Sequence, residues 1–234
     1  MKHNNNVESL TGINGKTAFL AVVNKLNDNT WGYTAGSKEP PLTSLRDLLT
    51  EIAPNNDRGK YACLDLGGEL SRNPQVQSLL AKQKYKLRPT ALDSPNQNAL
   101  AERPMQTIRN GIRELLQGAV LEWKYWPYSF YHFLRTLSWI SRSNQCISPY
   151  DAIMVKQPDI ADVRTFGCTC IIRLPGKRFS RLDNSTRDDI FLGYTSTMQN
   201  IWYVDTSTNR IKTDQHATYD EGMSNTPSKN PTSR

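Results

Sequence analysis

Residues 61–70 read YACLDLGGEL and join a short apolar segment to a carboxylate and two adjacent glycines. Residues 61–64 predict a buried strand, and the glycines at positions 67 and 68 predict the turn that follows it. Asp65 is therefore expected at the end of a buried strand.

A second carboxylate, Glu102, lies in the segment QNALAER (residues 97–103), early in a predicted helix. Thirty-six residues separate it from Asp65. If the helix packs across the strand, the two carboxylates converge, as they must in enzymes that hold two divalent metals about 3.5–4 Å apart for phosphoryl transfer. The simpler interpretation is a turn aspartate and a solvated glutamate favoured by the helix dipole. Two acids at this spacing do not decide between these interpretations.

The rest of the N-terminal part predicts a mixture of strands and helices. Residues 19–23 and 30–34 flank the polar, turn-prone segment 24–29, which is the pattern of a β-hairpin. Further along, apolar residues recur at helical spacing in four segments. They are Leu42, Leu45, Leu48, Leu49 and Ile52; Val76, Leu79 and Leu80 after Pro74; Ile108, Ile112, Leu115 and Ala119; and Phe130, Leu134, Leu137 and Ile140.

The composition changes after Arg142, and this change predicts the domain boundaries. Short strands are expected at residues 168–174, 189–194, 201–204 and 210–213, an arrangement typical of a small antiparallel barrel or sandwich. We therefore expect a mixed α/β domain and an all-β domain on either side of a proline-containing connector, and a polar, disordered tail. These segments are residues 1–142, 164–221, 143–163 and 222–234, respectively.

The charge of the chain is concentrated in one stretch. The 234 residues carry 29 basic and 22 acidic side chains, a net charge of +7. Residues 82–142 contain ten basic and four acidic groups, a net charge of +6. Such a basic stretch indicates a polyanionic partner or, equally, a solvated lysine-rich surface. No apolar run approaches the roughly 20 residues of a membrane span, and no signal-peptide pattern is present, so membrane and secreted classes are not expected.

The cysteines do not predict a disulfide framework or a zinc site. Cys168 and Cys170 form a single pair one residue apart, and the three histidines are far apart in the chain. Alternate positions on one face of a strand are the favoured interpretation of this pair.

Four segments in order resemble the integrase of copia-type retrotransposons. LDLGGEL, QNALAER, RTFGCTCIIRLP and IFLGYTS are similar to the family segments TDNGGEF, QNGVAER, RVFGCxAYVxxP and IFLGYS. The similarity is collinear from about residue 13 to residue 221 and includes the connector.

The resemblance implies an α/β fold class. An RNase H-like mixed sheet with flanking helices would be followed by a small all-β barrel of the Src-homology-three-like kind. It also implies an Asp, Asp, Glu triad that binds Mg²⁺ or Mn²⁺, and DNA integration through 3′-end processing and strand transfer. On this sequence, Asp65 matches the second aspartate and Glu102 the glutamate. The implied partners are element ends, target duplex and further copies of the chain, in the nucleus. No membrane partner or small-molecule substrate is expected.

The sequence departs from the family pattern at the catalytic positions. Residues 1–18 contain no aspartate to match the first carboxylate, and Leu66 and Ala99 replace the family's Asn and Gly. The zinc-binding N-terminal domain usual in integrases has no counterpart. We therefore expect a truncated, degenerate integrase that is inactive in strand transfer. The alternatives are an enzyme completed by a carboxylate upstream, a DNA-binding remnant without catalysis, and an inert fragment.

Pro104 leaves the start of the helix around Glu102 open. A helix that begins at Asn98 contains a proline that costs about 3 kcal/mol or bends the axis, whereas a helix that begins near Arg103 places Pro104 in its first turn.

Within the integrase resemblance, a continuous helix predicts a DNA-facing surface. It would place Glu102, Gln106, Arg109 and Arg113 on one face and bury Ile108, Ile112 and Leu115 on another. Lys84 and Lys86, in a run with Lys82 and Arg88, are predicted on the charged side of a strand, which either contacts DNA or protects a sheet edge.

Overall fold

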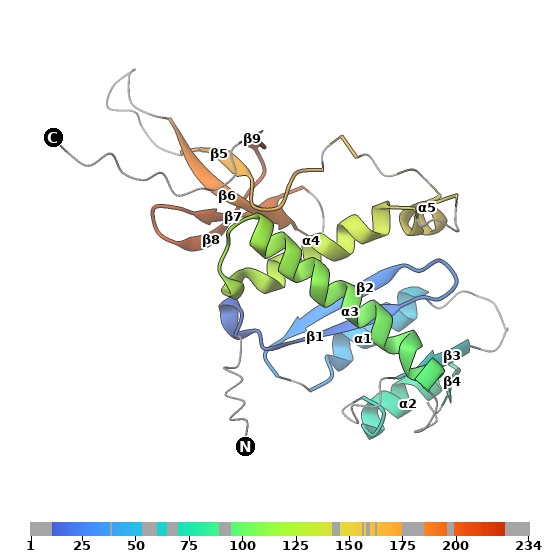
Figure 1. Ribbon diagram of the computed structural model, residues 1–234. Coiled ribbons are helices and arrows are strands. Elements are labelled where there is room, and N and C mark those ends of the chain that lie inside the picture. The colour runs from blue at the N-terminus through green and yellow to red at the C-terminus, as the bar shows by residue number, and fades with distance from the viewer. Residues whose placement is uncertain are drawn as a thin grey trace, which may run out of the picture. The chain divides into compact units, whose positions relative to one another are not determined.

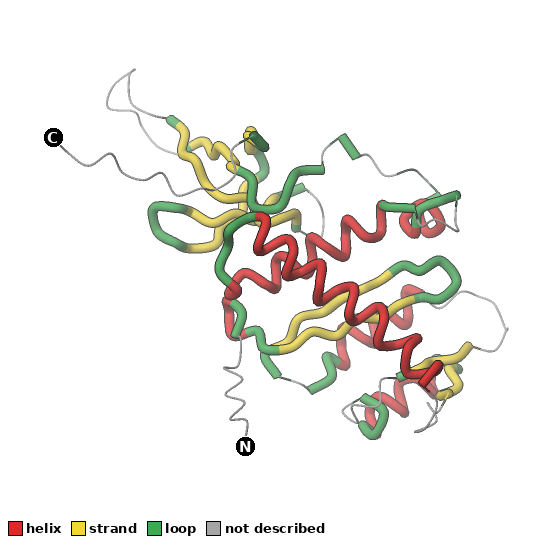
Figure 2. The backbone as a smooth tube through the Cα atoms, in the orientation of Figure 1, coloured by secondary structure: helices red, strands yellow, loops and turns green. Residues whose placement is uncertain are grey.

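The computed structural model describes residues 11–37, 39–52, 60–64, 70–88, 95–141, 146–155, 157, 160–161, 163–174, 185–195 and 199–222 (Figures 1 and 2). The fold is mixed α/β, and the chain divides into two compact units, Met1–Asn110 and Gly111–Arg234. This division falls inside the helix Pro95–Gly118, before the change in composition at Arg142. The boundaries drawn from composition at residues 142 and 163 stay predictions. The predicted disordered tail lies almost wholly outside the described residues.

The first unit begins with the predicted β-hairpin. After a short 3₁₀ turn, η1 (Ile13–Gly15), strands β1 (Ala18–Val23) and β2 (Thr30–Ala35) pair in antiparallel register, with Val22 opposite Trp31. Two asparagines shape the connection between the strands. The side-chain oxygen of Asn24 accepts the backbone N–H of Leu26, and that of Asn27 accepts the N–H of Asn29. These local bonds are the reason why such residues favour turns.

A parallel strand pair and two helices complete the core of the first unit. The elements are α1 (Leu42–Ile52), β3 (Lys60–Cys63), α2 (Pro74–Lys82) and β4 (Tyr85–Arg88), and β3 and β4 pair in parallel with α2 as the crossover. The Asn73 side chain caps α2 by accepting the N–H groups of Gln75 and Val76. Apolar side chains of both helices are buried together, and the strands add partly buried residues. The core comprises Leu45, Leu49, Val76 and Leu80, with Val22, Ala62, Leu64 and Tyr85 packed against it.

Helix α3 (Pro95–Gly118) is continuous and contains Pro104. Of the two starts that the sequence left open, the one near Arg103 is therefore excluded. Proline has no N–H, so the carbonyl of Leu100 loses its helical hydrogen bond. Among the described side chains of this helix, the buried apolar ones are Ile108, Ile112 and Leu116, while Leu115 is only half-buried. The predicted buried face is therefore corrected at Leu115. No helix within the described ranges has the length and apolarity needed to cross a membrane.

The helices of the second unit follow α3 after the short turn η2 (Trp123–Tyr125). They are α4 (Trp126–Trp139) and α5 (Pro149–Met154). Phe130 and Leu134 of α4 are buried as predicted, but Ile140 is 56% exposed because the helix ends at Trp139 and the chain becomes extended. A helix also forms within the predicted connector. It begins with a capping box, in which Ser148 and Asp151 exchange side-chain and backbone hydrogen bonds.

The strands of the second unit form one antiparallel sheet with the order β8-β7-β6-β5-β9. Four of them match the four predicted strands: β5 (Thr169–Arg173), β6 (Thr186–Tyr194), β7 (Ile201–Asp205) and β8 (Arg210–Asp214). The fifth strand, β9 (Ala217–Asp220), was not predicted, because its four residues include one aliphatic side chain and no alternating pattern. One face of the sheet is a core of buried residues: Cys168, Cys170, Ile172, Phe191, Ile201 and Tyr203.

Two buried aspartates join three strands of this sheet. Asp189 of β6 accepts two hydrogen bonds from the Arg187 guanidinium, at 2.8 and 2.7 Å, and a third from the backbone N–H of Thr206 at 3.0 Å. Asp205 of β7 forms ion pairs with Arg187 at 3.1 Å and with Lys212 of β8. The hydrogen bond from Lys212 is the main reason why the pKa of Asp205 lies well below its usual range. The hydrogen bonds and ion pairs of the two carboxylates therefore hold the β7–β8 turn against β6.

A close approach between two helices organises the second unit. The ring of Phe133 in α4 lies so near Gly111 of α3 that a Cβ atom there would be 2.1 Å from the ring. Beside it, the Ser129 hydroxyl donates a 3.1 Å hydrogen bond to the carbonyl of Ile112. At the end of α3, Ala119 leaves no room for a side chain at Gly167, which has a φ of +79°. Glycine is thus needed at both positions.

We predict that Gly111→Val lowers the free energy of unfolding by about 1–3 kcal/mol, because the Phe133 ring must move to admit the new side chain. The matched control is Gly118→Val in the same helix, where a Cβ meets no atom within 4 Å. Denaturant unfolding measures both variants. Equal free-energy losses in the two variants would show that the Gly111 contact does not limit packing.

Candidate functional site

The strand that leads to Asp65 is only partly buried, because Tyr61 and Cys63 are exposed, so the prediction of a buried strand is wrong. Leu64 packs against the core cluster formed by α1 and α2, and β3 ends one residue earlier at Cys63. Asp65 itself lies outside the described residues. The parallel register places Cys63 beside Arg88, so the chain leaves β3 and β4 at the same edge of the sheet. Asp65 follows β3 in sequence, and α3 is the element that follows β4.

Glu102 lies on α3 with its side chain exposed to solvent. Pro104 follows it by two residues, and the helix runs through this position without a break. Glu102 is therefore carried on a helix and does not lie at a cap. The structure places one of the two predicted carboxylates and leaves their separation undescribed.

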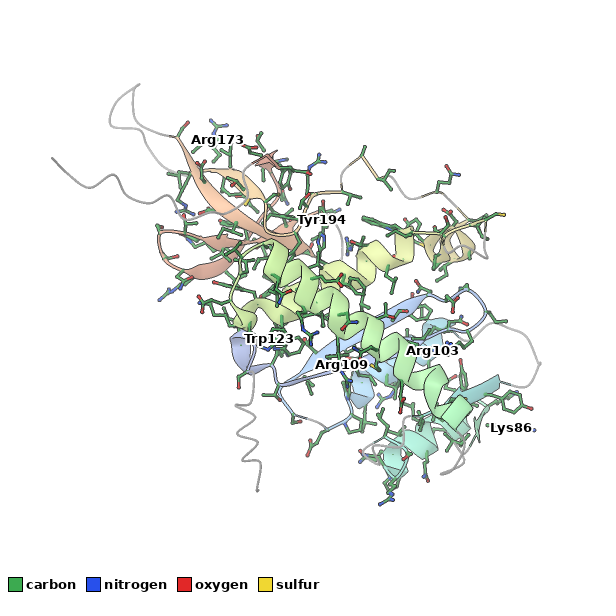
Figure 3. All side chains as sticks on the ribbon, viewed as in Figure 1. Lys86, Arg103, Arg109, Trp123, Arg173 and Tyr194 are labelled. Carbon is green, nitrogen blue, oxygen red and sulfur yellow. The ribbon has the colours of Figure 1, made fainter. Side chains whose placement is uncertain are left out.

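The predicted basic face of α3 is exposed. Gln106, Arg109 and Arg113 all lie at the surface, with Arg113 in the second unit. The amide nitrogen of Gln106 donates a 3.0 Å hydrogen bond to the side-chain oxygen of Asn110, one turn along. In the described part of the chain, the three arginines Arg103, Arg109 and Arg113 take part in no ion pair. Arg103 was missed from the sequence although it adjoins Glu102, and Figure 3 shows it on α3 with Arg109.

The lysines before α3 do not share a strand as predicted. Lys82 is the last residue of α2, and Lys84 lies in a tight turn with a φ of +59°, where its N–H donates to the carbonyl of Ala81. Only Lys86 and Arg88 belong to β4. The prediction of a strand is therefore wrong for Lys82 and Lys84. The alternation of charged and uncharged residues suggested a strand, but Lys82 ends α2 and Lys84 lies in the turn before β4. Lys84 and Lys86 are both exposed.

The described residues do not assemble a metal site. Within the described ranges, no three histidine, cysteine, aspartate or glutamate side chains gather where they could hold an ion. Of the predicted ligands, only Glu102 is described. A divalent metal bound by several carboxylates therefore has one identified donor here, and no reaction step is derived through a metal.

Cys168 and Cys170 lie in one buried cluster of the β-sheet, with Cys170 on β5 and Cys168 one residue before it, so the interpretation drawn from their spacing holds for the shared side but not for the strand position of Cys168. They are 4% and 0% exposed, and burial raises the pKa of both thiols to about 12. Both thiols are therefore protonated at neutral pH and pack as small apolar side chains. His132 is also buried between Phe166 and Phe191, and burial, followed by the nearby Arg135, lowers its pKa to about 4. It is a neutral core residue at pH 7.

Comparison with known proteins identifies relatives of the chain. No model of a known protein family matches it. It is 29% identical to the retrovirus-related Pol polyprotein from transposon RE1 of Arabidopsis thaliana over 129 residues, which is 55% of this chain and 9% of that polyprotein. The corresponding polyprotein from transposon RE2 of the same plant is 26% identical over equal shares. That from transposon TNT 1-94 of Nicotiana tabacum is 19% identical over 191 residues, 79% of this chain and 14% of the polyprotein.

These relatives are Pol polyproteins of plant retrotransposons. The chain spans about a tenth of the length of the curated relatives it matches. The similarity supports derivation from a retrotransposon Pol polyprotein. The family that the sequence segments resemble is also encoded by retrotransposons, so the two comparisons agree.

We predict that two of the four thiols react with Ellman's reagent at pH 8 in the folded chain. Cys63 and Cys146 are exposed, whereas Cys168 and Cys170 are buried and protonated. Denaturation should release the remaining two thiols at once. Equally fast reaction of all four thiols in the folded chain would contradict the burial of Cys168 and Cys170. A zinc chelator should change the number of reactive thiols neither in the folded nor in the denatured chain.

Proposed function

We propose that the chain is an integrase-like segment of a copia-type retrotransposon Pol polyprotein, which binds duplex DNA and is incomplete as a catalyst. Its relatives are Pol polyproteins of plant transposons, and its motifs follow the order of the integrase segments. The observation that carries the proposal is the exposed face of α3. There Arg103 and Arg109, together with Gln106, flank Glu102 without carboxylate partners in the described part of the chain.

The order of elements supports the finer part of the fold proposal, an RNase H-like core followed by a small barrel. An antiparallel hairpin precedes a parallel β3–α2–β4 crossover and a long helix. The antiparallel sheet with β9 placed beside β5 then follows. The first strand of this sheet, β5, pairs with its last strand, β9, as a partly open barrel would require.

Asp65 and Glu102 are proposed as two of the three carboxylates that would hold Mg²⁺ or Mn²⁺. The parallel strands β3 and β4 end at the same edge of their sheet. Asp65 follows β3 and the helix that carries Glu102 follows β4, and this order supports a shared site. When bound, such metals neutralise a scissile phosphate and activate the attacking hydroxyl. Residues 1–18 contain no aspartate to complete the set, so strand transfer is not expected from these residues alone.

DNA binding requires the arginine and lysine side chains but not the complete set of metal-binding carboxylates. Arginines on an exposed helix contact phosphates and release counterions, which gives affinity without base readout. The proposed contacts are Gln106, Arg109 and Arg113 on α3, together with Lys84 and Lys86. By resemblance, the proposal extends to a homo-oligomeric complex with element ends and target DNA in the nucleus.

We predict that Arg109→Gln weakens binding to random-sequence duplex DNA and lowers the slope of log K against log salt by about 0.9. Arg46→Gln on α1, also an exposed arginine of the first unit, should leave both quantities unchanged. Fluorescence anisotropy at several salt concentrations measures the slopes. Absence of binding by the unsubstituted chain at low salt would favour the inert-fragment alternative.

We predict no strand transfer by the chain in the presence of Mn²⁺, because one carboxylate of the triad has no counterpart in its sequence. The assay joins a labelled element-end duplex to plasmid DNA, beside Asp65→Asn and Glu102→Gln. Activity that both substitutions abolish would show that the chain forms a complete metal site, and the proposed incompleteness would then be wrong.

A further inference from the structure

The sheet of the second unit has a long hollow along its edge strand, β9. The hollow has a volume of about 1030 Å³, and we call it the β9 groove. Its lining includes residues from both ends of β6, Thr186 and Tyr194, so it extends along the sheet (Figure 3 labels Tyr194 and, well apart from it, Arg173). The residues that define it here are Arg173, Thr186, Tyr194, Ile201, Ala217 and Tyr219.

The free edge of β9 lies beside this groove. Strand β9 pairs with β5 on one side, and among the described strands none pairs with its other side. Ala217, Thr218 and Tyr219 of this strand line the groove. A sheet edge presents unpaired N–H and C=O groups that bind an added extended strand, while neighbouring pockets receive alternate side chains.

The walls of the groove are held in place by contacts within the second unit. The rings of Tyr194 and Tyr219 pack edge-on against the buried Phe191, with centroids 5.1 and 5.5 Å away. The hydroxyl of Tyr194 accepts the backbone N–H of Arg164 at 3.0 Å. A wall that is already ordered loses little conformational entropy when a ligand binds.

The charges of the groove favour a single carboxylate over a polyphosphate chain. Arg164 is committed to local partners: its guanidinium lies over the Tyr219 ring at 5.0 Å, donates to the carbonyls of Ala161 and Val163, and is 3.9 Å from the Glu221 carboxylate. Arg173, the last residue of β5, is exposed and takes part in none of the described ion pairs. One available guanidinium binds one carboxylate well, whereas nucleic acid binding draws on several cations along a backbone.

From this geometry we propose that the β9 groove binds an extended, acidic peptide segment of a partner protein. The peptide adds as a strand to the outer edge of β9, one carboxylate pairs with Arg173, and an apolar side chain lies between Tyr194 and Tyr219. The site belongs entirely to the second unit and does not depend on the function proposed for α3.

The test measures binding of a fluorescein-labelled ten-residue peptide of alternating glutamate and valine to the full chain by fluorescence anisotropy. Binding should weaken about tenfold in Arg173→Gln, because a charge-assisted pair is lost. It should be unchanged in the matched control Arg210→Gln, since Arg210 is an exposed arginine of β8 outside the groove. Arg173→Glu should bind a lysine–valine peptide in place of the acidic one.

Hydrogen exchange locates the added strand. Saturating acidic peptide should slow exchange of amides in residues 217–220 and leave the opposite edge, β8, unchanged. The proposal is overturned by absence of acidic-peptide binding at millimolar concentration, by equal loss in Arg210→Gln, or by protection of β8. Tighter, Arg173-dependent binding of a ten-nucleotide oligothymidine would also overturn it, because the groove would then be a nucleic acid site.

Discussion

The contact between Phe133 and Gly111 brings α3 and α4 so close together that a side chain at position 111 would displace the Phe133 ring. The hydrogen bond from Ser129 to the Ile112 carbonyl reinforces the same crossing. Because this crossing orients the last turns of α3, Ile112 and Leu116 are buried and Arg113 remains at the surface. A helix that supplies core contacts on one face can carry an exposed, charged segment on another.

That charged segment is the structural basis of the proposed DNA contacts. Most of the net charge of the chain lies in residues 82–142, and on α3 it is displayed by exposed arginines without carboxylate partners in the described ranges. Pro104 does not end the helix, although it removes one backbone hydrogen bond. The helix therefore tolerates a local cost of about 3 kcal/mol that packing further along must offset.

Local patterns predicted the elements whose residues interact with near neighbours. The hairpin of β1 and β2, the spacing of Leu45 and Leu49, and the helix after Pro74 all depend on short-range geometry. Predictions were wrong where a residue's role depends on what packs against it. Leu116 is buried in place of Leu115, and β9 forms only because β5 offers an edge. Of the candidate site, the exposed face of α3 was predicted, while Arg103 was not.

The sequence by itself determined the likeness to retrotransposon Pol polyproteins, the basic stretch and the order of the elements, since all three are properties of residues along the chain. Only the tertiary structure decided which polar groups are buried. Asp189 and Asp205 look like ordinary strand-end acids in sequence, yet both are buried and paired. A buried carboxylate stays charged only where a cation and N–H donors surround it, and those partners come from neighbouring strands.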